Sequence, residues 1–101
     1  MHGERITLAI VELDPGAIAA EHNHPNEQLG IVLQGTITFR VGDEQRKLGQ
    51  GETWVIPSGT PHEATAGPEG CVVIDVFAPP RDDFRNLPAL PERAPVWPLT
   101  S

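Results

Sequence analysis

Hydrophobic and polar residues alternate in short segments along most of the chain, and turn residues separate the segments at intervals of about eight to twelve residues. A period of two is typical of strands with one buried face, and no long stretch shows the 3.6-residue period of an amphipathic helix. The pattern predicts strands over residues 5–10, 17–24, 29–34, 36–41, 45–48, 53–56, 62–65 and 71–77, with a loop over 66–70. This arrangement indicates an all-β sandwich or barrel.

Length and proline content divide the chain into two parts. A total of 101 residues matches one domain, and we expect a barrel over residues 1–86. The segment 87–101 carries four prolines, which preclude regular structure and predict an extended tail. Its Val96 and Trp97 are unusual in a solvated tail, so we expect it to pack on the barrel or on a partner subunit.

Composition excludes several classes of function. Fourteen acidic and seven basic residues give a net charge of −7, which argues against nucleic acid as a partner. No apolar run reaches the roughly 18 residues of a membrane helix, so we expect no membrane partner. The N-terminus lacks a signal-peptide pattern, and Cys71 is the single cysteine. We therefore expect a cytoplasmic protein with no internal disulfide, in which Cys71 is a buried apolar residue.

Three histidines are spaced as metal ligands would be. His22 and His24 fall two residues apart in a predicted strand, so their side chains share one face about 6–7 Å apart. A barrel would bring His62 across to them from a later strand. Gln28 offers a further ligand oxygen, with Glu27 as the alternative, and imidazole ligands suit Zn, Fe, Ni, Cu or Mn.

The spacing of these residues resembles the two motifs of the cupin superfamily. In the first motif, Gly, His-x-His, Glu and Gly follow at fixed intervals, and the matching residues here are Gly16, His22, His24, Gln28 and Gly35. In the second, the matching residues are Gly51, Pro57, Gly59 and His62. Gln28 stands where Glu is usual, and Ala66 stands where Asn is usual. The seven-residue step to Gly35 selects Gln28 over Glu27.

This resemblance implies a cupin jelly-roll barrel with a bound metal. The implied ligands are His22, His24, Gln28 and His62, and the implied cofactor is one divalent transition metal per chain, one of Mn, Fe, Ni, Zn, Co or Cu. Because Gln is neutral, the charge of the cation stays uncompensated, which favours Lewis-acid chemistry on an anionic substrate.

Two charged residues near the last strand have open interpretations. Asp75 lies within an apolar strand, where it either faces outward or caps a loop, or points into the barrel as a proton-transfer group. Arg81 either forms a surface ion pair with Asp82 or Asp83, or binds a substrate carboxylate at the barrel mouth. Phe77 shares the face of Asp75 two residues on. Trp54 and Phe39 are interpreted as core residues rather than pocket walls.

The segments 22–28 and 75–84 resemble those of pectin-degradation cupins, which linearise 4,5-unsaturated uronates to linear keto acids. By this resemblance, Asp75 would be the acid/base and Arg81 would hold the substrate carboxylate. Phe77 would pack against the substrate ring.

Three hypotheses for function follow. The first is a metal-dependent lyase or isomerase of the uronate-linearising type, acting on a small carboxylate. The second is a dioxygenase or other oxidoreductase using Fe or Cu, and the third is a non-catalytic cupin that binds a small ligand. Small cupins commonly pair through their sheets, so we expect a homodimer in which the N-terminal strand or the tail from residue 87 bridges the subunits.

Overall fold

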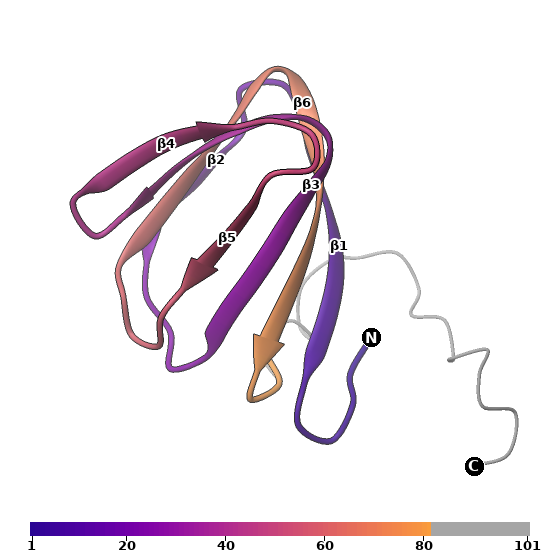
Figure 1. The fold of residues 1–101 in the computed structure, drawn as a ribbon, viewed down its shortest axis with the longest axis vertical. Helices are drawn as coiled ribbons and strands as arrows, with labels where there is room; N and C mark the ends of the chain where they lie inside the picture. Colours follow the sequence, from indigo (N-terminus) through magenta and orange to yellow (C-terminus); the bar gives the residue numbers. More distant parts are fainter. Residues whose placement is uncertain (82–101) are drawn as a thin grey trace, which may run out of the picture.

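A computed structural model describes residues 1–81 of the chain. These residues form six strands and no helix (Figure 1), and hence none long and apolar enough to cross a membrane. The strands are β1 (Thr7–Leu13), β2 (Ile18–His22), β3 (Glu27–Val41), β4 (Glu44–Leu48), β5 (Thr53–Ile56) and β6 (His62–Ala78). The expected all-β class is confirmed, whereas the boundary at residue 86 and the tail over 87–101 lie outside the described residues.

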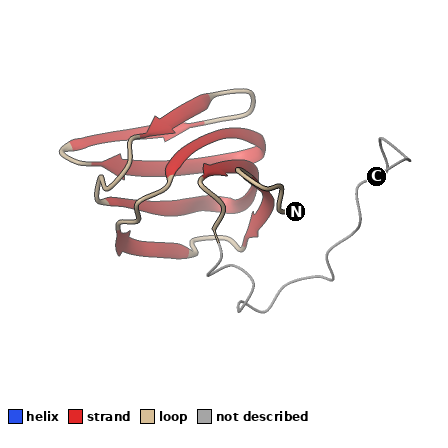
Figure 2. Cartoon of the chain, turned by 90° about the horizontal axis from the view of Figure 1, so that it is seen from below, coloured by secondary structure: helices blue, strands red, loops and turns tan. Residues whose placement is uncertain are grey.

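The two longest strands build the barrel. β3 and β6 pair in antiparallel register from Glu27↔Ala78 to Val41↔His62, with irregularities near Gly35. One half of this pair is flanked by β1 on β6 and by β5 on β3, and the other half by β2 on β6 and β4 on β3. The bent pair thus contributes to both layers of a jelly-roll barrel (Figure 2).

Two predicted breaks are bends within continuous strands. The strands expected over 29–34 and 36–41 are both part of β3, and the loop expected over 66–70 lies within β6. Gly35 and Gly70 have φ angles of 78° and 77°, and a Cβ on Gly35 would lie 2.2 Å from the carbonyl oxygen of Gly70. The glycines permit the two strands to bend and cross closely without ending, so the prediction of a loop at 66–70 is wrong.

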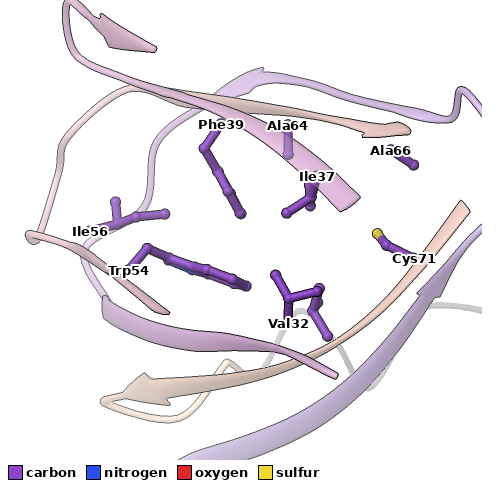
Figure 3. Close-up of a cluster of buried hydrophobic side chains, with 9 residues drawn as sticks. Val32, Ile37, Phe39, Trp54, Ile56, Ala64, Ala66 and Cys71 are labelled. Carbon is purple, nitrogen blue, oxygen red and sulfur yellow. The ribbon is translucent and has the colours of Figure 1, made fainter. Parts of the chain in front are cut away.

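Apolar side chains fill one end of the barrel interior (Figure 3). Trp54 and Phe39 lie in this core with ring centroids 4.6 Å apart, which confirms their interpretation as core residues. The indole of Trp54 lies directly over Gly30, where a Cβ would be 2.1 Å from the ring. Along β6, Val73 belongs to this core, and the next buried positions are Asp75 and Phe77. The barrel interior therefore becomes polar at Asp75.

The outer face of the sheet containing β1 and β5 is also apolar. Leu8 and Leu29 both pair with Val76, and Leu29 also pairs with Val55. Leu8, Leu29 and Val55 are exposed, as is Ile10 on the same face of β1. This sheet therefore presents a row of apolar side chains on its outer surface within the described part of the chain.

Candidate metal centre

The three histidines of the sequence pattern converge at the polar end of the barrel. His22 ends β2 and pairs with His62, which begins β6. His24 follows in the loop after β2, so the prediction that one strand carries both His22 and His24 is wrong. Their ring centroids lie between 4.3 and 5.6 Å apart. One nitrogen from each ring lies within 4.8 Å of the other two, close enough for the three to bind one ion.

Hydrogen bonds orient each imidazole in the same way. The Nδ1 atoms of His22, His24 and His62 lie 2.8, 3.0 and 2.8 Å from the backbone oxygens of Ala20, Asn26 and Thr60. Because a carbonyl only accepts, each Nδ1 carries the proton and each Nε2 keeps its lone pair for a metal. Nε2 of His62 is buried without a hydrogen-bond partner among the described residues.

Burial lowers the pKa of two of these rings. For His24 and His62, loss of solvation is the largest cause. For His24 the second cause is the positive charge of Arg81. Both rings therefore favour the neutral form, which is the form that binds a metal.

Gln28 adds an oxygen to the three nitrogens. Its side chain is buried on β3, with Oε1 3.2 Å from Nε2 of His24, whereas the neighbouring Glu27 is exposed. The geometry therefore favours Gln28 over Glu27 as the fourth donor. Three imidazoles and one amide oxygen fit a divalent transition metal and suit Mn, Fe, Ni, Zn, Co and Cu alike.

Asp75 faces the barrel interior directly behind Gln28. Its side chain is 8% exposed, and its Oδ1 accepts a hydrogen bond of 2.9 Å from Nε2 of Gln28. The interpretation in which Asp75 faces outward is therefore wrong. Burial raises the pKa of Asp75 from 3.8 to about 6, against the opposing effects of the Gln28 hydrogen bond and the charge of Arg81.

Arg81 lies beside the histidines at the mouth of the barrel. It helps to line a cavity of about 560 Å³, together with His22, Asn23, His24, Pro25, Asn26, Pro79 and Pro80. Its guanidinium carbon is 4.9 Å from the ring centroid of Phe77, which is 2% exposed and also contacts the ring of His24. Phe77 therefore supports Arg81, and its packing against a substrate ring stays a prediction. Asp82 and Asp83 lie outside the described residues.

Two further buried polar residues, which the sequence pattern does not indicate, also reach this region. The Asn26 side chain donates hydrogen bonds to the backbone oxygens of Pro79 and Pro80, the latter at 3.3 Å. Oγ1 of Thr7 accepts a 3.0 Å hydrogen bond from the Arg81 backbone N–H and lies 2.7 Å from Nδ1 of His2. No local sequence pattern indicates these contacts, because Asn26 and Thr7 lie in a turn and a strand far along the chain from residues 79–81.

Known proteins share this fold and parts of the sequence. The pectin degradation protein KdgF of Dickeya dadantii is 30% identical over 80 residues, covering 78% of this chain and 73% of that protein. Oxalate decarboxylase OxdC of Bacillus subtilis is 30% identical over 79 residues, covering 73% of this chain and only 20% of that protein.

The solved structures that superimpose on this chain include a KdgF protein and a further cupin. KdgF from a Halomonas species superimposes with a TM-score of 0.79 at 35% identity, covering 83% of this chain and 77% of that chain. An RmlC-like cupin from Shewanella frigidimarina gives a TM-score of 0.76 at 28% identity, covering 80% and 72%. The Cupin domain family matches residues 9–77, and the chain therefore belongs to the cupin family.

Proposed function

We propose that this cupin is a metal-dependent enzyme that linearises 4,5-unsaturated uronates. The observation that carries the proposal is the contact chain from His24 through Gln28 to Asp75, which sets a proton-transfer group beside the candidate metal ligands. Arg81 supplies a positive charge at the adjoining cavity. The similarity to KdgF, named for pectin degradation, supports the same substrate class.

The proposed ligands are His22, His24, Gln28 and His62. A divalent metal held there supplies a Lewis acid that polarises a substrate oxygen. The hydrogen bonds that Nδ1 donates fix the direction of each imidazole, and Asp75 fixes the Gln28 amide so that its oxygen faces the histidines. These contacts organise the donors before a cation binds, which reduces the entropy lost on binding.

Asp75 is the proposed acid and base. In the cyclic substrate, the ring oxygen joins C1, which carries a hydroxyl, to C5 of the C4–C5 double bond. Asp75 removes the hydroxyl proton, the bond from C1 to the ring oxygen breaks, and C1 becomes an aldehyde. The electron pair remains on the oxygen at C5 as an enolate, which takes up a proton from Asp75 at C4 and becomes a ketone. One proton leaves and one is added, so the step is an isomerisation without an oxidant. Burial raises the pKa of Asp75 to about 6 in the metal-free protein, and a pKa near neutral pH suits a carboxyl that both accepts and releases a proton.

Arg81 is the proposed binding group for the substrate carboxylate. A guanidinium offers two parallel N–H donors to a carboxylate, which fixes the orientation of the sugar ring as well as its position. The contact with Phe77 holds the guanidinium on one side, so its donors remain directed by the fold.

Turnover tests the proposal directly. The protein is loaded in turn with Mn, Fe, Ni, Zn, Co and Cu, and loss of the ultraviolet absorbance of the C4–C5 double bond is followed without oxygen. We expect turnover with at least one metal, loss of turnover in Asp75→Asn with metal retained, and full activity in the exposed control Asp43→Asn. Wild-type turnover in Asp75→Asn would exclude its catalytic role.

The same assay separates the alternatives. Activity only in the presence of oxygen, with Fe or Cu, would indicate an oxidoreductase. Saturable binding of a uronate without turnover by any metal form would indicate a ligand-binding cupin and would overturn the enzymatic proposal.

A further inference from the structure

Arg81 lies beyond the last residue of β6, so strand pairing does not hold it. β6 ends at Ala78, and the following residues, Pro79 and Pro80, have no backbone N–H. The segment 79–81 therefore has a single backbone donor, the N–H of Arg81. Side chains from elsewhere in the fold satisfy this donor and the carbonyls of the two prolines.

Thr7 accepts from that donor. Its hydroxyl oxygen lies 3.0 Å from the Arg81 nitrogen, and Thr7 itself is 1% exposed at the start of β1. Thr7 pairs in register with Phe77, whose ring lies under the Arg81 guanidinium. The hydroxyl of Thr7 also lies 2.7 Å from Nδ1 of His2, and this second hydrogen bond fixes its direction. One end of β1 thus holds both the backbone of Arg81 and the strand beneath its side chain.

Asn26, which lines the cavity, contacts the same segment through its side chain. Its side chain is buried and donates to the carbonyl oxygens of Pro79 and Pro80. Its own backbone oxygen accepts from Nδ1 of His24. A single residue therefore links a candidate metal ligand to the segment that carries Arg81.

We propose that Thr7 and Asn26 are positioning residues that set the place of the Arg81 guanidinium relative to the histidines, and hence the affinity of the site for a carboxylate. The inference rests on the proposed function in that Arg81 binds a carboxylate. Binding in a bidentate geometry depends on the direction of the guanidinium plane. Removal of either contact weakens carboxylate binding, while the metal ligands keep their own hydrogen bonds.

The test compares matched variants of the metal-loaded full chain. Thr7→Val removes the hydroxyl at nearly constant shape, Thr7→Ser keeps it, and Asn26→Ala removes the second contact. Thr53→Val makes the same chemical change at an exposed position of β5 and is the control. The probe is D-galacturonate, a saturated uronate that lacks the C4–C5 double bond, with neutral D-galactose to isolate the carboxylate. The dissociation constant, the metal content and the hydrogen exchange of the Arg81 amide are measured.

Thr7→Val loses one hydrogen bond to the segment 79–81, and Asn26→Ala loses two. We expect each variant to weaken galacturonate binding on the order of tenfold, about the net contribution of one hydrogen bond. Metal content and galactose binding should stay at wild-type values. The Arg81 amide should exchange on the order of tenfold faster in Thr7→Val and at the wild-type rate in Thr7→Ser and Thr53→Val. A merely structural role of Thr7 would lower thermal stability without this selective loss of carboxylate affinity.

Two results would overturn the inference. One is galacturonate affinity in Thr7→Val and Asn26→Ala equal to that of Thr53→Val, and the other is a wild-type protein that does not distinguish galacturonate from galactose. Failure of the proposed function looks different. In that case galacturonate binds and responds to the variants as expected, but the unsaturated uronate is not turned over.

Discussion

The buried carboxylate of Asp75 should destabilise the metal-free fold at neutral pH. Its pKa is raised by burial from 3.8 to about 6, so the folded state binds this proton more tightly than the unfolded state does. Asp75 therefore costs no stability below pH 3.8, its cost grows as the pH rises from 3.8 to about 6, and the cost is constant at higher pH. Each pKa unit corresponds to about 1.4 kcal/mol, so the ionised Asp75 costs about 3 kcal/mol.

Asp75→Asn removes the charge and keeps the shape. The Asn oxygen can still accept the hydrogen bond that Gln28 donates. We expect Asp75→Asn to be more stable than the wild type by about 3 kcal/mol at pH 8 and to differ little at pH 4. The measurement is urea unfolding in the presence of a chelator, followed by the fluorescence of the buried Trp54.

A matched control identifies the cause. Asp43→Asn removes the same charge from an exposed turn and should change the free energy of unfolding by less than about 0.5 kcal/mol at either pH. Equal stability differences for Asp75→Asn at pH 4 and pH 8 would refute the reasoning. Burial would then not disfavour the ionised carboxylate, and the argument for proton transfer near neutral pH would lose its physical basis.

Further predictions concern the fold, the metal and the surface. Gly35→Ala should destabilise the protein by at least about 2 kcal/mol in chemical unfolding, because a Cβ would meet the Gly70 carbonyl at a positive φ. His62→Ala should lower metal affinity by more than about a hundredfold in a chelator competition. Wild-type metal content should decline on acidification with a midpoint below pH 6.5, because burial lowers the pKa of His62 and of the neighbouring His24. We also propose that two copies pair through the apolar face of β1, so Ile10→Lys should yield monomers in sedimentation, and a wild-type monomer would contradict this.

The convergence of the histidines was predictable from their spacing in the two motifs, although the pairing of His22 with His62 joins two strands far apart in the sequence. His22 and His24 are two residues apart, and the turn before His62 is marked by Pro57 and Gly59. Alternation along β3 likewise buries Gln28 and exposes Glu27. The burial of Gln28 follows from the period of two, and the turn before His62 follows from turn chemistry. His24, by contrast, lies in the loop after β2, where its Nδ1 hydrogen bond to the Asn26 backbone oxygen orients it.

The orientation of Asp75 was not predictable, because β6 is apolar on both faces. Ile74 and Val76 alternate with Val73 and Phe77, so hydrophobic pattern alone does not identify the inner face. The strand register determines which way Asp75 points. Asp75 pairs with Gly30 of β3, and Gly30 lies two residues after Gln28, so Asp75 and Gln28 share the inner face of the sheet.

Contacts between distant segments and bends within strands could not be predicted from the sequence either. Asn26 bonds to a residue 53 positions away, and Thr7 bonds to one 74 positions away. The sequence around Gly70 predicts a turn. Whether the chain reverses there or only bends depends on the strand that packs against Gly70, which the local sequence does not reveal.

Gln28 and Asp75 are best understood as one unit. A glutamate at position 28 would place a second carboxylate about as close to Asp75 as the present 2.9 Å hydrogen bond, and two such groups do not both ionise at that separation. Either the ligand or the proton-transfer group would then be protonated. The neutral amide avoids this conflict, because its oxygen faces the histidines while its N–H donates to the carboxylate. The departure from the usual cupin glutamate therefore leaves Asp75 as a group that can exchange a proton next to the candidate metal ligands, which is the property that the proposed isomerisation requires.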